Sequence, residues 1–272
     1  MFARMVALAV VLVSLAVPAL AQSAPTLRDV NGINGFDEMV EQLETSFRSA
    51  LDKYPGPKPE PLVEAWKEAQ DGAFDAERMI AELEGVIAAQ LKPEEIAVLL
   101  DHFKSDFGMR ISLLEIAATR PDVQQAKDTE GSTLYAELEE KDPERLALYD
   151  RLIEDMQAVD IGEAIGLNMT YAMVSAMLGA AKQPVTDEQI AAVVKQNAAT
   201  MRAAIEDSVT SSTAWTYRDL GLDDMRKYVA FLETPAARRY YQAAMMALDR
   251  VLTDEARAFG NRLMIALGQR KA

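Results

Sequence analysis

Side chains that commonly perform acid–base chemistry are scarce in this chain. It has one histidine, His102, and no cysteine. A histidine that acts as a general base needs a partner that positions it. His102 lies between Asp101 and Phe103 in a stretch with helical periodicity, and the sequence identifies no such partner. We therefore expect His102 to be a partly exposed helical residue, and we predict no catalytic residue.

Metal and cofactor sites are restricted by the same composition. Zinc sites of the usual kinds need several cysteines or histidines, and a di-iron bundle needs two Glu-x-x-His pairs. The segment DVNGINGFDE (29–38) carries acids and asparagines but lacks the acid spacing and the final glutamate of a calcium loop. A glycine-rich phosphate loop and a G-x-S-x-G turn are also missing. The sequence thus predicts no bound metal, no cofactor and no enzymatic activity; an enzyme that uses carboxylates alone is the remaining catalytic alternative.

The charge of the chain bears on its partners. The 272 residues carry a formal net charge of −15, with no basic block to offset the acids. Such a surface repels phosphate backbones, so we expect no nucleic-acid partner. Without cysteine the fold has no disulfide, and its stability must come from packing, which a chain with 50% hydrophobic residues can supply.

The first residues have the pattern of a secretory signal. Arg4 is followed by an uncharged apolar stretch from Met5 to Val17, and Ala19-Leu20-Ala21 forms a small-residue cleavage site. We expect residues 1–21 to be a signal peptide cleaved after Ala21, the protein to be periplasmic, and residues 22–35 to be a flexible mature N-terminus. An uncleaved membrane anchor is the alternative.

The remaining sequence predicts an all-α protein. Apolar residues recur at spacings of three and four, as in Phe36, Val40, Leu43 and Phe47. We divide the chain into a first helical half (36–181) and a second helical half (186–272), with a linker over 120–133 that has at most a short helix. Thr186 and Gln189 have the spacing of a capping box at the start of the second half.

One uncharged segment, 164–181, needs a separate decision. Its 18 residues approach the length of a membrane-spanning helix, yet they include Asn168, Thr170, Tyr171 and Ser175. A helix that is apolar on most sides is usually interior in a soluble protein. We predict a buried central helix and no integral membrane span; a transmembrane helix is the alternative.

Two segments resemble each other. Residues 91–111 align with residues 220–240 without gaps, at an offset of 129. Five apolar positions coincide, and Ser105 aligns with Thr234, which precedes Pro235. Serine and threonine are good N-caps and proline suits the first helical position. We therefore predict two helix–corner–helix units, copy one (91–118) and copy two (220–247), within a bundle built around the apolar central helix.

These corners resemble the exported bacterial family called domain of unknown function 2059, over about 25 residues per copy. Its characteristic pattern is an aromatic pair, a Ser or Thr, a proline, a glycine and a basic residue. Each copy of this chain departs once: copy one has Asp106 in place of the proline, and copy two has Ala237 in place of the glycine. The matching positions are Phe103, Ser105, Gly108 and Arg110 in copy one, and Phe231, Leu232, Thr234, Pro235 and Arg239 in copy two. The resemblance implies an all-helical periplasmic domain with no assigned activity.

Two functions remain open at this point. The first is a non-enzymatic periplasmic scaffold that binds another envelope protein or a second copy of itself, because helical grooves accept partner helices. The second is a carrier or sensor of a hydrophobic, lipid-like small molecule held between helices near the methionine-rich central segment. The 14 methionines can line an adaptable groove or fill an ordinary core, and we favour the core.

Overall fold

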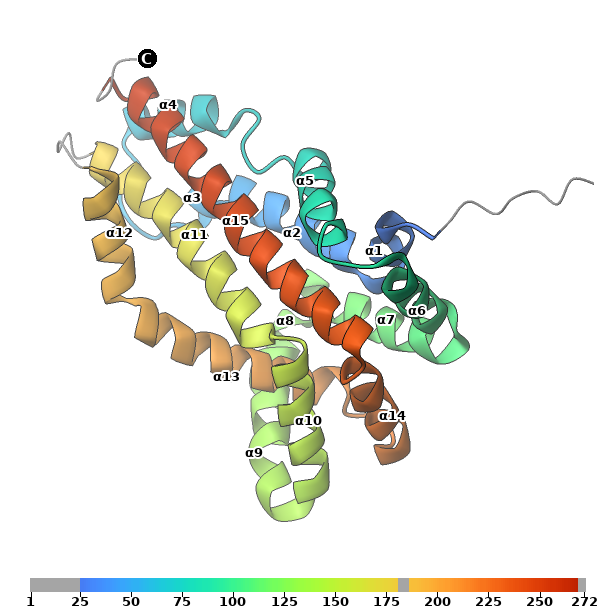
Figure 1. The fold of residues 1–272 in the computed structure, drawn as a ribbon. Helices are drawn as coiled ribbons and strands as arrows, with labels where there is room; N and C mark the ends of the chain where they lie inside the picture. Colours follow the sequence, from blue (N-terminus) through green and yellow to red (C-terminus); the bar gives the residue numbers. More distant parts are fainter. Residues whose placement is uncertain (1–24, 181–185, 269–272) are drawn as a thin grey trace, which may run out of the picture.

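The protein is all-α, as the sequence predicts (Figure 1). The computed structural model describes residues 25–180 and 186–268, and no strand occurs within these ranges. The predicted signal peptide and the segment 182–185 lie outside the described residues. The α-helices are α1 (Leu27–Asn34), α2 (Phe36–Arg48), α3 (Ala50–Lys53), α4 (Glu60–Gln70), α5 (Ala76–Ala88), α6 (Pro93–Lys104), α7 (Asp106–Ala118), α8 (Gln124–Ala126), α9 (Ser132–Lys141), α10 (Pro143–Asp155), α11 (Ala158–Ala180), α12 (Asp187–Gln196), α13 (Ala198–Thr216), α14 (Leu222–Leu232) and α15 (Pro235–Ala266).

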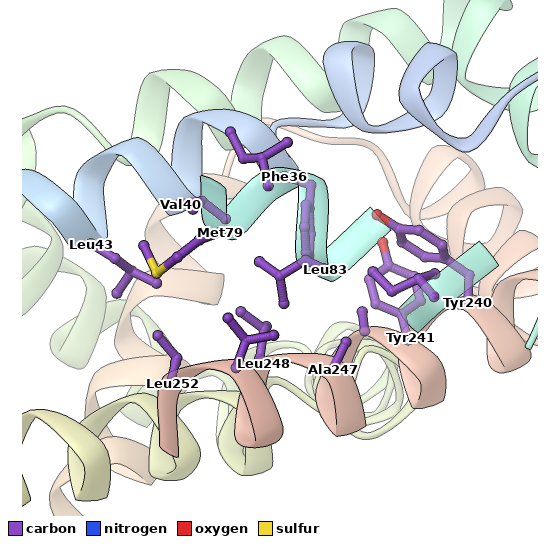
Figure 2. Close-up of a cluster of buried hydrophobic side chains, with 14 of the residues drawn as sticks. Phe36, Val40, Leu43, Met79, Leu83, Tyr240, Tyr241, Ala247, Leu248 and Leu252 are labelled. Atoms are coloured by element: carbon purple, nitrogen blue, oxygen red, sulfur yellow. The ribbon is translucent and has the colours of Figure 1, made fainter. Parts of the chain in front are cut away.

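The long helix α15 organises the fold. Its 32 residues extend for about 48 Å, at about 1.5 Å per residue. It packs along α11 on one side and against α4, α5 and α6 on the other (Figure 1). Figure 2 shows how α2 and α5 place Val40, Leu43 and Met79 over Leu248 and Leu252 of α15, and all five side chains are buried.

Both predicted corners are present. The N-cap hydroxyl Ser105 Oγ accepts a hydrogen bond from the backbone N–H of Gly108 at 3.0 Å, and Thr234 Oγ1 accepts one from Ala237 at 3.3 Å. Pro235 is the first residue of α15, as predicted. At Gly108 an added Cβ would lie 2.0 Å from the carbonyl oxygen of His102, so the first corner requires glycine there. The common origin of the two units as a repeat stays a prediction.

The N-terminal segment differs from the flexible one expected over 22–35. Residues Leu27–Asn34 form α1, which begins with a capping box between Thr26 and Asp29. Leu27 and Val30 are buried in the core. A helix of eight residues makes about two turns, which is too short to be stable alone or to show a clear periodic pattern. Its packing against α6 and α2 stabilises it.

The segment 120–133 also differs from the expected linker. A 3₁₀ turn (Pro121–Val123), the short helix α8 and a π turn (Lys127–Gly131) lead directly into α9. The π turn approaches α13 so closely that a Cβ on Gly131 would lie 2.1 Å from the carbonyl oxygen of Ser211. This tertiary contact, which leaves no periodic pattern in the sequence, makes the segment helical.

The central helix α11 is less interior than predicted. Within 164–181, the buried side chains that the structure describes are those of Ala164, Asn168, Ala172, Ser175 and Ala176, and most others are half-buried. The helix contacts α15, α13, α12 and α4, so it lies within the bundle and borders solvent in part. Among the described helices, none combines the length and the apolar character that crossing a membrane requires.

Candidate functional site

The strongest candidate site is a cavity of about 230 Å³ between five helices, which we name the Glu115 cavity. Most of its wall is apolar or aromatic. Met39 of α2 and Met156, the residue that caps α10, contribute flexible side chains to it. The full lining is Asn34, Gly35, Phe36, Met39, Glu115, Met156, Ala158, Ile161, Tyr240, Tyr241, Ala244 and Leu248.

Glu115 supplies the carboxylate of this cavity. It belongs to α7, and its Oε1 accepts hydrogen bonds from two tyrosine hydroxyls: Tyr228 of α14 at 2.6 Å, and Tyr217, which follows α13. Within the described residues no group donates to Oε2, and the Glu115 side chain is half-buried. Glu115 lines the cavity and its Oε1 is occupied, so Oε2 is the oxygen of this carboxyl group that remains for a bound molecule.

The surroundings of Glu115 disfavour its ionised form. Burial raises the pKa of its carboxyl group, and the hydrogen bonds from Tyr217 and Tyr228 counteract this only in part. Burial, with the negative charge of Glu115, likewise raises the pKa of the Tyr217 and Tyr228 hydroxyls well above the ordinary value. These hydroxyls are therefore protonated donors throughout the physiological pH range, and they hold the carboxyl group in one orientation.

Aromatic rings form one wall of the Glu115 cavity. Tyr240 and Tyr241 of α15 meet edge to face with 5.2 Å between ring centroids, and Phe36 approaches Tyr240 at 6.5 Å. Figure 2 shows Tyr240 and Tyr241 together at one end of the apolar cluster, with Phe36 nearer its middle. Two residues of α1 hold the Tyr240 hydroxyl in place: it donates to Asn31 Oδ1 at 2.9 Å and accepts from Asn34 Nδ2 at 2.8 Å.

His102 does not belong to this site. Its ring stacks on Phe231 with 3.3 Å between centroids and 3° between planes. Burial, and to a lesser degree the charge of Lys227, lowers the pKa of His102 to about 4. Nε2 is buried without a hydrogen-bond partner among the described residues. His102 thus packs as a neutral aromatic residue of α6, and its side chain is partly exposed, as expected.

The segment 29–38, which we discounted as a calcium loop, contributes to the candidate site in another way. Asn31 and Asn34 orient Tyr240, and Gly35 lines the cavity with a positive φ of 83°. Asp29 serves as the third residue of the α1 capping box. In the described part of the chain, no three His, Asp or Glu side chains converge to hold a metal ion.

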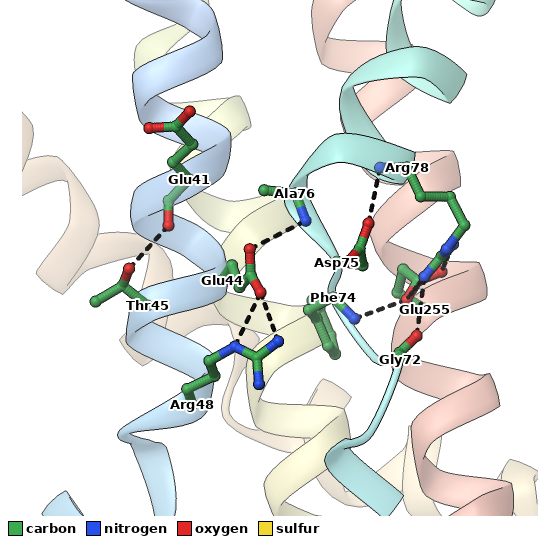
Figure 3. A network of polar contacts seen from close by, with 10 residues as sticks. All are labelled: Glu41, Glu44, Thr45, Arg48, Gly72, Phe74, Asp75, Ala76, Arg78 and Glu255. Atoms are coloured by element: carbon green, nitrogen blue, oxygen red, sulfur yellow. Dashed lines mark hydrogen bonds and ion pairs between the residues drawn. The ribbon is translucent and has the colours of Figure 1, made fainter.

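A second buried carboxylate is structural. Glu255 of α15 accepts hydrogen bonds from the Phe74 N–H at 2.8 Å and from Arg78 at 2.5 and 2.8 Å (Figure 3). Phe74 has a positive φ of 50°, a conformation that costs about 1–3 kcal/mol in a residue of this kind. Burial opposes ionisation of Glu255, but the bonds from Arg78 and Phe74 outweigh it, so the pKa is lowered. Glu255 therefore holds the loop before α5 against α15.

Another cavity, of about 260 Å³, borders the methionine-rich central segment where we expected a ligand to lie. Leu167, Asn168 and Tyr171 of α11 face it. It is also lined by charged side chains, Lys195 of α12 and Arg257 of α15 among them. The Glu115 cavity is the more apolar of the two, and it lies at the beginning of α11. Its methionines, Met39 and Met156, lie outside the methionine-rich central segment.

Sequence reasoning named no site residue and missed Glu115. One signal was available: Phe107, Ile111, Glu115 and Ala118 recur at spacings of four, four and three, which places a glutamate on the apolar face of α7. A carboxyl group in that position is expensive to bury. Its partners come from α13 and α14, more than 100 residues later, so the sequence could not show what surrounds it.

Comparisons of this chain with protein-family models, with curated proteins and with solved structures find no match. The resemblance to domain of unknown function 2059 therefore stays a prediction, and the functional argument rests on the geometry of the site.

Proposed function

We propose that this protein is a non-catalytic binding protein that holds a small, mainly apolar molecule in the Glu115 cavity, as a carrier or sensor in the periplasm. The observation that carries the proposal is a cavity of about 230 Å³ whose wall is apolar and aromatic apart from a few polar groups. Ligand sites combine such walls with a small number of placed polar groups.

The size and the wall of the cavity support this role. An apolar cavity of about 150 Å³ accepts benzene, whereas drug-sized ligands occupy about 300–1,000 Å³. At 230 Å³ the Glu115 cavity suits a single ring or a short chain. Met39 and Met156 can adjust to the shape of a ligand because the methionine side chain is unbranched and flexible.

The test uses a neutral probe of matching size, 2-phenylethanol, titrated into the protein by isothermal calorimetry. Ala158, the half-buried first residue of α11, lines the cavity. We expect Ala158→Phe to abolish binding by filling the space. Ala126→Phe, a change at a half-buried alanine of α8 outside the cavity lining, should leave binding intact. Equal binding by both variants would contradict the proposal, as would the failure of the wild type to bind any probe of this size.

The scaffold role that the sequence suggested first also has a specific observation in its favour. Val98 of α6 and Met109 and Leu113 of α7 are large apolar side chains with exposed fractions of 47, 42 and 66%. A partner or a second copy would cover such side chains. If they mediate self-association, Leu113→Ser should shift the mass measured by light scattering to that of the monomer, and an unchanged mass would count against this role.

A further inference from the structure

The charge that the Glu115 cavity can present to a ligand is negative. Of its lining residues only Glu115 has an ionisable carboxyl group, and none is lysine, arginine or histidine. A ligand carboxylate or phosphate would find no positive side chain here and would face the Glu115 carboxylate. The lining therefore disfavours anionic amphiphiles such as fatty acids, although they match its apolar character.

The two oxygens of Glu115 have different environments. Oε1 is occupied by the hydroxyls of Tyr217 and Tyr228, which can also stabilise negative charge on the carboxyl group. Oε2 has no donor among the described residues. A donor from the ligand would give this oxygen a partner inside an enclosed site, where hydrogen bonds are stronger than in water.

The aromatic wall favours a positively charged donor over a neutral one. The rings of Phe36, Tyr240 and Tyr241 line the cavity together with Glu115. The faces of aromatic rings attract cations, and this attraction strengthens when water is excluded. The net charge of −15 additionally raises the local concentration of cations around the protein.

We infer that the ligand of the Glu115 cavity is a small amphipathic amine, whose ammonium group pairs with Glu115 Oε2 and whose apolar body lies against Met39, Met156 and the aromatic wall. The inference rests on the proposed function and narrows it to a ligand class. With a volume of about 230 Å³ for the whole ligand, the apolar body is about the size of one ring.

Three probes of nearly equal size test this inference: 2-phenylethylamine, 2-phenylethanol and phenylacetate, each titrated by calorimetry at pH 7. We expect the amine to bind about tenfold more tightly than the alcohol, because a charge-assisted hydrogen bond is about twice as strong as a neutral one. We expect phenylacetate to bind most weakly. Tightest binding by phenylacetate, or equal binding by amine and alcohol, would overturn the amine assignment and leave the cavity as an apolar site. Failure of all three probes would overturn the proposed function itself.

Variants assign the effect to Glu115. Glu115→Gln keeps the side-chain shape and removes the charge, so the amine should lose its advantage while the alcohol keeps its affinity. Glu84→Gln is the matched control, since Glu84 is also a half-buried helical glutamate and does not line the cavity. Retention of the amine preference in Glu115→Gln would overturn the inference. The comparison of probes on the wild type decides the question even if a variant fails to fold.

Discussion

At the scale of single residues, the buried Glu255 and the half-buried Glu115 have opposite roles because their partners differ. Glu255 has a full set of donors, including a guanidinium group, and its pKa is lowered. Among the described residues, Glu115 receives hydrogen bonds from two hydroxyls, both on one oxygen, and its pKa is raised. In the sequence both are glutamates on amphipathic helices, where acids usually face water. Only the tertiary arrangement separates a structural carboxylate from one that is available to a ligand.

The raised pKa of Glu115 predicts how stability depends on pH. The hydroxyls of Tyr217 and Tyr228 bond to it, and Tyr241 feels its charge. In the described part of the chain, no basic group contributes to the pKa of Glu115. The folded protein therefore binds this proton more tightly than the unfolded chain does. This contribution to stability is complete below about pH 4, the ordinary range of the carboxyl group, and is lost as the pH rises through the raised value.

We expect Glu115→Gln to remove this loss. In thermal unfolding between pH 4 and pH 8, the melting temperature of the variant minus that of the wild type should increase with pH. Glu84→Gln removes one carboxyl group outside the cavity lining and corrects for the change in net charge. A constant difference between Glu115→Gln and the wild type across this range would show that Glu115 does not titrate in an enclosed site.

The Arg78 ion pairs allow a matched comparison of buried and exposed acids. Arg78 contacts Glu255, whose side chain is 8% exposed, and Glu82, which is 50% exposed and four residues away on the same helix. We expect Glu255→Gln to lower the free energy of unfolding by about 2–3 kcal/mol, because it weakens the bonds that hold Arg78 and Phe74. Glu82→Gln should cost at most about 0.5 kcal/mol. Similar losses in chemical denaturation would contradict the structural role of Glu255.

At the scale of elements, the two helix–corner–helix units face each other reciprocally. Arg110 of the first unit bonds Asp224 of the second at 2.6 Å, and Arg239 of the second bonds Glu95 of the first at 3.1 Å. In the alignment of the two copies the arginines correspond to each other, and so do the acids. The sequence predicted each corner from cap and proline chemistry, which is local. It could not show that the units contact each other.

The second corner gives an order of destabilisation. Leu232 is fully buried, so Leu232→Asp places an unpaired charge in the core and should be the most damaging change. Thr234→Ala removes the cap of α15 and should cost about 1 kcal/mol. Pro235→Ala should cost least, since proline at the first helical position mainly restricts the unfolded chain.

Chemical denaturation of these three variants checks the order. Ser105→Ala at the first corner is a useful companion, because its hydroxyl caps α7 in the same way and its loss should match that of Thr234→Ala. If Thr234→Ala left the free energy of unfolding unchanged but abolished probe binding, the corner would be a functional site and its architectural role would be contradicted.

At the scale of the whole molecule, the sequence predicted the all-α class and many helices, because apolar periodicity and helix caps depend on residues close together in the chain. It did not predict α1, or the turns before α9, which depend on contacts with distant helices. The Glu115 cavity likewise depends on contacts between distant helices. Its lining comes from the five helices α1, α2, α7, α11 and α15 and from residues beside them such as Gly35 and Met156, so it exists only in the assembled bundle.

The central claim, that the Glu115 cavity binds a ligand, is tested most directly by the methyl signals of methionine. In protein labelled with ¹³C-methyl methionine, titration with 2-phenylethylamine should shift the signals of Met39 and Met156, which line the cavity. Met225, buried elsewhere, and Met246, exposed on α15, should not move. The account predicts saturable shifts at the first pair alone. Shifts confined to Met246, or no shift at Met39 and Met156 at saturating probe, would contradict it.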